Sequence, residues 1–186
     1  MHRYDLHRIL KEELKDDSRD LVTRPSGRVI RERIEKDIEG EKDGAVVALD
    51  FSKIGIVDYS CADEIVAKII SRLLGGEYGD RYILLLGLNE NQKENIEVAL
   101  ERKGLAAIAR MRDGENILLG NLNNYLKETL HFVTEKGKIA AGELSERFKL
   151  PANTSGTRLL NLHKKRLVKR TDEMRNSGRV WVYEKI

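Results

Sequence analysis

The sequence predicts an α/β protein with a smaller helical domain and a β-hairpin at its C-terminus. Three observations lead to this prediction. Short apolar runs alternate with amphipathic stretches over residues 1–120, the pattern becomes mainly helical after Asn121, and positive charge is concentrated in the last third. The chain has 186 residues, of which 40% are hydrophobic and 35% are charged. That is enough for one substantial core or two small ones.

Two amphipathic helices are expected at the start of the chain. Apolar residues recur every three or four positions over residues 5–16 and again from Ser26 to Gly40. A charged stretch separates the two helices. We therefore assign residues 1–19 to a helical N-terminal arm and residues 20–122 to one α/β domain.

A sheet is expected in this domain. The apolar runs that predict its strands lie at residues 45–51, 81–87, 105–110 and 116–119. Between them, Ser60 begins a strongly apolar helix that ends at Gly75-Gly76, and residues 94–103 form an amphipathic helix. Strands and helices therefore alternate, which is typical of a sheet with right-handed crossover helices.

Composition excludes several classes of protein. The single cysteine, Cys61, excludes a disulfide framework and a cysteine-based zinc site, and it suits a reducing compartment. No apolar run approaches the roughly 18–20 residues that span a bilayer, and no apolar signal region follows Met1. We therefore expect a cytoplasmic protein with no membrane contact, no metal and no cofactor.

Charge divides the chain near Gly120. Residues 121–186 carry 14 Lys and Arg against 7 Asp and Glu, whereas residues 1–120 carry 20 against 24. Such asymmetry is typical of a nucleic-acid-binding module joined to a different domain. A basic solvated face would have the same composition, so the motifs must decide between the two.

Residues 123–186 are predicted to form the second domain. Helices are expected near 122–135, at 143–148 and from Leu159 to Leu167, and they are followed by strands from Val168 and over 179–183. Three helices and a hairpin are the outline of a winged helix. No Pro-, Gly- or Ser-rich linker precedes this domain, so we expect its first helix to connect the two domains rigidly.

Residues 140–168 resemble a winged helix-turn-helix of the prokaryotic regulator type. Leu144 and Phe148 match the packing positions of the first helix of that motif, and Leu159 and Leu162 match those of its second helix. Arg166 departs from the pattern, because the family usually has Gly or Asn there. The resemblance implies that the second helix enters the major groove of duplex DNA.

Small, polar and basic side chains on that helix and on the hairpin are the expected DNA contacts. We expect base contacts from Asn153, Ser155, Thr157, Arg158 and Asn161. We expect backbone or minor-groove contacts from Lys164, Lys165, Lys169, Arg170, Arg175 and Arg179. Two alternatives stay open at this point. The first is that the winged helix binds a protein and not DNA. The second is that Arg158 forms an intramolecular ion pair with Glu143 or Glu146 and does not contact a base.

Residues 45–120 are similar to the STAS family, which includes anti-sigma factor antagonists and the cytoplasmic domains of sulphate transporters. Asp50 ends a strand, and Asp58-Tyr-Ser60 precedes an apolar helix, as in that family. Phe51 and Ala62-Asp63-Glu64 match its less characterised STAS-like branch. The resemblance implies an α/β sheet with crossover helices.

The same resemblance makes Ser60 and Asp58 a candidate switch. In anti-sigma factor antagonists the matching serine is phosphorylated by a partner kinase, which would add charge beside Asp58. Cys61 departs from that group, because a glycine usually follows the serine. Ser60 and Asp63 alternatively form a capping box at the start of the helix, a role that is compatible with phosphorylation.

No catalytic motif supports an enzyme, since the sequence contains no P-loop, no nucleophile elbow and no His-Glu-x-x-His. We therefore expect a homodimeric transcriptional regulator whose STAS-like domain receives a signal and whose winged helix binds duplex DNA. The rival hypothesis is a phospho-regulated interaction module that has a protein kinase, an ATPase or another regulatory protein as its partner. A small-molecule ligand in the α/β domain is a third alternative.

Overall fold

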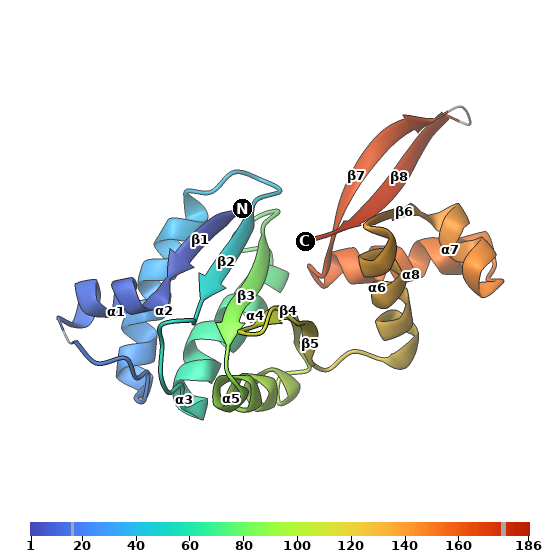
Figure 1. Cartoon of the computed structure of the whole chain (residues 1–186). Coiled ribbons are helices and arrows are strands. Elements are labelled where there is room, and N and C mark those ends of the chain that lie inside the picture. Colours follow the sequence, from blue (N-terminus) through green and yellow to red (C-terminus); the bar gives the residue numbers. More distant parts are fainter. Residues whose placement is uncertain (16, 176–177) are drawn as a thin grey trace. The chain divides into compact units, whose positions relative to one another are not determined.

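The computed structural model describes residues 1–15, 17–175 and 178–186, and for Arg175 it describes the backbone alone. The chain has a mixed α/β fold that divides into two compact units, Met1–Asn121 and Leu122–Ile186 (Figure 1). Each unit has its own sheet.

The larger unit is built on a five-stranded sheet in the order β1-β2-β3-β4-β5. Its strands are β1 (His2–Asp5), β2 (Val46–Asp50), β3 (Tyr82–Leu88), β4 (Ala106–Met111) and β5 (Asn116–Gly120). The first four strands run parallel and β5 runs antiparallel to β4. Successive parallel strands lie side by side, so right-handed crossovers place the connecting helices on one face of the sheet.

The helices of the larger unit share one core with that face. They are α1 (Leu6–Leu14), α2 (Arg24–Glu39), α3 (Tyr59–Cys61), the π-helix η1 (Ala62–Ala67), α4 (Lys68–Leu74) and α5 (Glu90–Glu101). Leu6, Ile34, Ile69 and Ile96 pack with Val47 and the other inward side chains of the strands. The segment from α3 to α4 is a continuous helical stretch whose middle is π-helical, a local geometry that is frequent at functional sites.

The expected helical arm at residues 1–19 is not what the structure shows. His2–Asp5 form β1, which pairs with β2, and Leu6, Ile9 and Leu10 of α1 are fully buried in the core of the larger unit. The strand escaped prediction because its four residues, His-Arg-Tyr-Asp, are neither apolar nor alternating. Residues 1–19 are therefore an edge of the α/β unit.

The smaller unit combines three helices with a three-stranded antiparallel sheet in the order β6-β8-β7. Its elements are α6 (Asn124–Lys136), β6 (Lys138–Ala140), α7 (Ala141–Phe148), α8 (Ala152–Lys164), β7 (Val168–Arg175) and β8 (Gly178–Lys185). Leu126, Val133, Leu144, Leu159 and Val182 are among its buried side chains. The short strand β6 was not predicted. The predicted turn at 175–178 lies partly outside the described residues.

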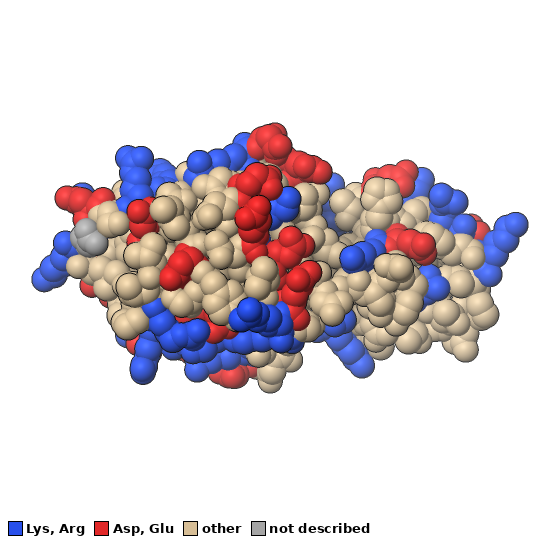
Figure 2. Space-filling view, turned by 90° about the horizontal axis from the view of Figure 1, so that it is seen from below, with Lys and Arg blue, Asp and Glu red and all other residues tan. Residues whose placement is uncertain are grey.

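Charged side chains gather in patches on one face of the larger unit. In Figure 2, acidic side chains form a band across the middle of the view, whereas Lys and Arg gather along its lower edge. Exposed Glu90, Glu94 and Glu101 lie on α5. No helix in the described ranges has both the length and the apolar character that crossing a membrane requires.

Candidate nucleic-acid interface

The outward face of α8 carries most of the expected base contacts. Leu159 and Leu162 are fully buried, which turns this face of the helix toward the core of the smaller unit. Asn153 and Thr157 are exposed and Asn161 is half-buried, and these three residues repeat every four positions along the opposite side. The helix therefore offers two amides and a hydroxyl on one side.

Ser155 does not belong to this outward face. Its side chain is fully buried, so the expected base contact from Ser155 is wrong. The reason is helical periodicity, because Ser155 lies four residues before Leu159 and shares its inward direction. The spacing was visible in the sequence, but the residue type suggested an exposed position.

Four of the expected DNA contacts line one hollow of about 350 Å³ in the smaller unit. The hollow is lined by Tyr125, Asn153, Thr154, Thr157, Arg158 and Asn161. Tyr125 comes from α6 and the other five residues come from α8. The fold therefore adds an exposed aromatic ring to a polar and basic helix face, a contribution that the sequence did not reveal.

The Arg158 guanidinium lies over the Tyr125 ring, with its Cζ 5.1 Å from the ring centroid. Among the described residues Arg158 forms no ion pair with Glu143 or Glu146, and Glu143 accepts a hydrogen bond from the Ala140 amide. The alternative that Arg158 pairs with one of these glutamates is therefore wrong. A cation–π contact orients the guanidinium without occupying its N–H donors as a carboxylate would.

The hairpin β7–β8 carries a second basic and aromatic surface. Arg170 lies 3.7 Å from the centroid of the exposed Trp181 ring, and Arg179 lies 6.0 Å from the same centroid. Arg179 also bonds Asp172 at 2.6 Å. In the strand register, Asp172 faces Trp181 and Met174 faces Arg179, so these side chains share one face of the hairpin.

The remaining expected cations are not all brought together. Lys164 is the last residue of α8 and is exposed, and Lys165 follows it directly. Lys169 pairs in register with Glu184 and therefore lies on the opposite face of the hairpin from Arg170. The side chain of Arg175 lies outside the described residues.

Arg166 has a positive φ of 59°. Glycine and asparagine tolerate this left-handed conformation best. Arg166 adopts the same backbone geometry at a conformational cost of about 1 kcal/mol.

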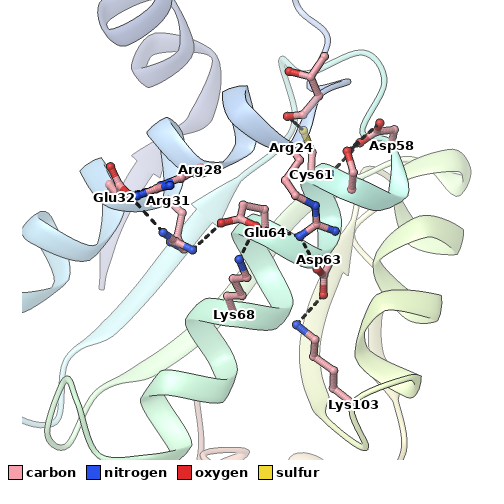
Figure 3. Close-up of polar contacts among 12 residues, drawn as sticks. Arg24, Arg28, Arg31, Glu32, Asp58, Cys61, Asp63, Glu64, Lys68 and Lys103 are labelled. Atoms are coloured by element: carbon pink, nitrogen blue, oxygen red, sulfur yellow. Dashed lines mark hydrogen bonds and ion pairs between the residues drawn. The ribbon is translucent and has the colours of Figure 1, made fainter.

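The candidate switch in the larger unit has a different geometry from the expected capping box. Asp58 is the N-cap of α3, and its Oδ1 accepts the Cys61 amide at 2.8 Å. The Ser60 hydroxyl donates to both Asp58 carboxylate oxygens, at 2.9 and 3.0 Å. Asp63 pairs with Arg24 and Lys103 (Figure 3) and does not cap the helix. The expected capping box of Ser60 and Asp63 is therefore wrong.

This geometry defines what a phosphate on Ser60 would do. The half-buried hydroxyl would lose the proton that it donates to Asp58, and a charge of about −1.5 to −2 would stand beside that carboxylate. The N-cap of α3 would be disturbed. Phosphorylation of Ser60 stays a prediction.

Cys61 is a buried free thiol next to Ser60. Its Sγ donates to the Thr23 carbonyl at 3.0 Å. Burial, and then the negative charge of Asp58, raise the pKa of the thiol to about 12. The group is therefore an un-ionised hydrogen-bond donor at neutral pH.

Comparison with known proteins assigns no family to the chain, since no protein-family model and no curated protein matches it. The resemblances to a STAS domain and to a winged helix-turn-helix therefore stay predictions. Function must be inferred from the geometry of α8, of the hairpin and of the helical segment at Ser60.

Proposed function

We propose that the smaller unit binds duplex DNA and that the chain is a transcriptional regulator whose larger, STAS-like unit receives the signal. One observation carries the DNA-binding proposal. Asn153, Thr157, Arg158 and Asn161 line a single hollow on the outward face of α8. Amides, hydroxyls and a guanidinium on one side of a helix are the groups that read base edges in the major groove.

The order of elements supports this proposal. Helix, strand, two helices and a hairpin follow one another, and the sheet order β6-β8-β7 places the first strand beside the last. A winged helix-turn-helix has this arrangement. In it, α7 and α8 would form the helix-turn-helix pair and β7–β8 the wing.

The hairpin would supply contacts to the DNA backbone. Arg170 and Arg179 lie on the same face as Trp181. The ion pair between Arg179 and Asp172 is exposed, and such pairs contribute about 0–1 kcal/mol. A phosphate would therefore displace Asp172 at little cost.

Binding would be tested with the full chain by fluorescence anisotropy of labelled duplexes. One duplex is selected from a random pool and one has a scrambled sequence. At about four phosphate contacts, the dissociation constant for either duplex should rise about a hundredfold between about 50 mM and about 200 mM salt. A dissociation constant that does not respond to salt would refute phosphate contact.

Variants separate base contacts from charge. Asn161→Ala should weaken binding to the selected duplex by about tenfold or more and leave the scrambled duplex unaffected. Arg158→Ala should weaken the selected duplex more than Lys136→Ala does. Both variants remove one positive charge, but Lys136 is exposed at the far end of α6, about 16 Å along the helix from Tyr125. Equal losses of affinity for the selected duplex in Arg158→Ala and Lys136→Ala would contradict a base contact from Arg158.

The rival function is a phospho-regulated module whose smaller unit docks a protein. Its support is the Ser60 hydroxyl, which is half-buried and bonded to Asp58 at a helix N-terminus. Intact-mass spectrometry of the protein from its native cell, together with a pull-down, would discriminate between the two functions. Stoichiometric phosphate on Ser60, a recovered kinase and no DNA binding would favour the rival.

A homodimer is also part of the proposal, because one small DNA-binding unit offers limited interface for a specific site. Sedimentation equilibrium of the full chain, alone and with a selected duplex, would measure the stoichiometry. One chain per duplex would contradict it.

A further inference from the structure

We propose that the larger unit contains a binding site for a small phosphate-bearing ligand. The site is a hollow of about 540 Å³ that α2, η1 and α4 line together. Its lining residues are Arg24, Pro25, Arg28, Arg31, Glu64, Lys68 and Arg72. Five of these seven residues are cationic and one is acidic. This inference does not depend on the proposed binding of DNA.

Glu64 lines the hollow, is buried and is compensated by three cations, whose contacts with it are drawn in Figure 3. Its carboxylate contacts Arg31 at 2.5 Å, Lys68 at 2.5 Å and Arg24 at 3.0 Å. The side chain of Glu64 is only 3% exposed. Its single negative charge is therefore shared among three positive groups and is shielded from a ligand.

Three of the five cations occupy the outer part of the hollow, whereas the side chain of Arg31 is only 7% exposed. The side chain of Arg28 is 68% exposed, that of Arg24 is 50% exposed and that of Arg72 is 41% exposed. Two of their carboxylate partners are more deeply placed, since the side chains of Asp63 and Glu35 are 9% and 11% exposed, whereas Glu32 beside Arg28 is 47% exposed. A ligand that enters from solvent therefore meets Arg24 and Arg72 before it meets Asp63 and Glu35.

Carboxylates hold these cations in place, two of them deeply placed and one, Glu32, half exposed. Asp63 bonds Arg24 at 2.9 Å and Glu35 bonds Arg72 at 2.7 Å, while Arg28 bonds Glu32 at 2.7 Å. Ordering a long side chain costs conformational entropy when a ligand binds. A side chain that an ion pair already orders loses less entropy on binding. Guanidinium groups held in this way are suited to bidentate contacts with phosphate oxygens.

The acidic groups remain charged at neutral pH, so the framework persists there. Burial raises the pKa of Asp63, but hydrogen bonds from Lys103 and Arg24 outweigh it and hold that pKa below its ordinary value. The same balance applies to Glu64, where Lys68 and Arg31 outweigh burial.

Close packing between α2 and the π-helix keeps the hollow in shape. A Cβ at Gly27 would lie 3.2 Å from both Cys61 Sγ and Glu64 Cβ. The two helical segments therefore approach each other closely at Gly27, which allows Arg24 and Arg31 of α2 to reach Glu64. The cations at the hollow thus lie on a rigid scaffold.

The size of the hollow favours a small ligand. Its volume lies within the range of about 300–1,000 Å³ that is usual for small-molecule sites. The surrounding unit is acidic, with 20 Lys and Arg against 24 Asp and Glu over residues 1–120. A long polyanion would meet repulsion beyond the hollow, whereas a compact phosphate ester would contact the hollow alone.

Inorganic pyrophosphate is the probe for this site. Titration calorimetry of the full chain, at constant ionic strength, should show saturable binding. Arg28→Ala should raise the dissociation constant about tenfold, and Arg28→Lys should restore only part of the loss, because lysine keeps the charge without the bidentate geometry. Far-UV circular dichroism would confirm that both variants fold.

Arg33→Ala is the matched control. Arg33 also lies on α2 and also pairs with a carboxylate four residues later, Asp37, but it does not line the hollow. Its removal should leave the dissociation constant for pyrophosphate within about twofold of the parent, since Arg33 does not line the hollow and its charge is paired with Asp37 and Glu13. Equal effects of Arg28→Ala and Arg33→Ala would overturn the proposal, as would the absence of saturable binding.

Further ligands identify the source of the phosphate. Adenosine should not bind, and adenosine triphosphate that binds more tightly than pyrophosphate would indicate a nucleotide. Equal affinities would indicate recognition of phosphate alone, and both results support the site. If duplex DNA displaces pyrophosphate and Arg28→Ala weakens DNA binding, the hollow is part of a nucleic-acid surface and the proposal is wrong.

Discussion

Replacing Glu64 by Gln tests whether the buried ion-pair cluster stabilises the larger unit. The substitution removes one negative charge and changes side-chain volume little. Glu64 is bonded to Arg31, whose side chain is 7% exposed. In the variant, the guanidinium of Arg31 stays buried, and a neutral amide replaces the carboxylate with which it makes its shortest contact.

The size of the effect follows from burial. Breaking a buried ion pair by removing one partner costs about 3–5 kcal/mol, because the remaining charge is left uncompensated. Arg31 keeps longer contacts with Glu35 at 3.3 Å and Glu32 at 3.4 Å, and Arg24 keeps Asp63. We therefore expect the lower end of the range, a loss of about 3 kcal/mol in the free energy of unfolding.

The effect should depend on pH with a definite sign. Burial raises the pKa of Glu64, but Lys68 and Arg31 outweigh it, so the folded-state pKa lies below the ordinary value of 4.5. A lowered pKa means that the stabilisation is fully present above about pH 4.5 and is lost as pH falls through the folded-state value. The difference between the parent and Glu64→Gln should therefore be largest near neutral pH and shrink in acid.

Urea unfolding of the full chain, followed by far-UV circular dichroism, would measure this difference. Trp181, the single tryptophan, lies in the smaller unit, so its fluorescence reports that unit separately. Glu94→Gln, at an exposed position of α5, is the matched control and should stay within about 0.5 kcal/mol of the parent. A loss below about 1 kcal/mol for Glu64→Gln, or a loss that does not change with pH, would refute the reasoning.

Three further predictions concern single sites. Gly120→Ala should destabilise the larger unit by about 1–3 kcal/mol in urea unfolding. The reason is that φ of Gly120 is +82° and an added Cβ would lie 2.3 Å from the Leu105 carbonyl oxygen. An unchanged unfolding midpoint would contradict this prediction. Cys61 should react with iodoacetamide at pH 8 only after urea unfolds the protein, since the thiol is buried with a pKa raised to about 12; rapid labelling of the native protein would show that the thiol is accessible. Ser60→Glu should lower the free energy of unfolding by about 1 kcal/mol, because the new carboxylate repels that of Asp58, the N-cap of α3. Ser60→Ala should lower it by less. Equal decreases in the two variants would indicate that charge plays no part.

Much of the fold could be predicted because its main signals are local. The runs that form β2 and β3 are continuously apolar, as expected for parallel strands that are covered by neighbours, and the α/β class is confirmed. β1 could not be predicted, because its four polar residues form a strand only through pairing with β2. The cap of α3 was misassigned because Asp58 and Ser60 both have suitable side chains, and three-dimensional geometry selects Asp58.

The candidate sites differ in the same way. Residue type predicted Asn153, Thr157 and Asn161 on the exposed side of α8 but wrongly added Ser155, which helical periodicity would have excluded. Tyr125 could not be found, since it lies 33 positions before Arg158 and on another helix. The cation-lined hollow was missed as well, because Arg31 and Glu64 are separated by 33 positions and meet only where α2 packs against η1.

The sequence by itself determined the α/β class, the core strands β2 and β3 and the change in character near residue 121. These properties follow from the order and spacing of neighbouring residues, which act over one or two turns of backbone. Only the tertiary structure decided which charges meet, which thiol and hydroxyl are buried, and which ring covers Arg158. Those outcomes depend on contacts between distant segments, and such contacts exist only once the helices have packed on the sheet.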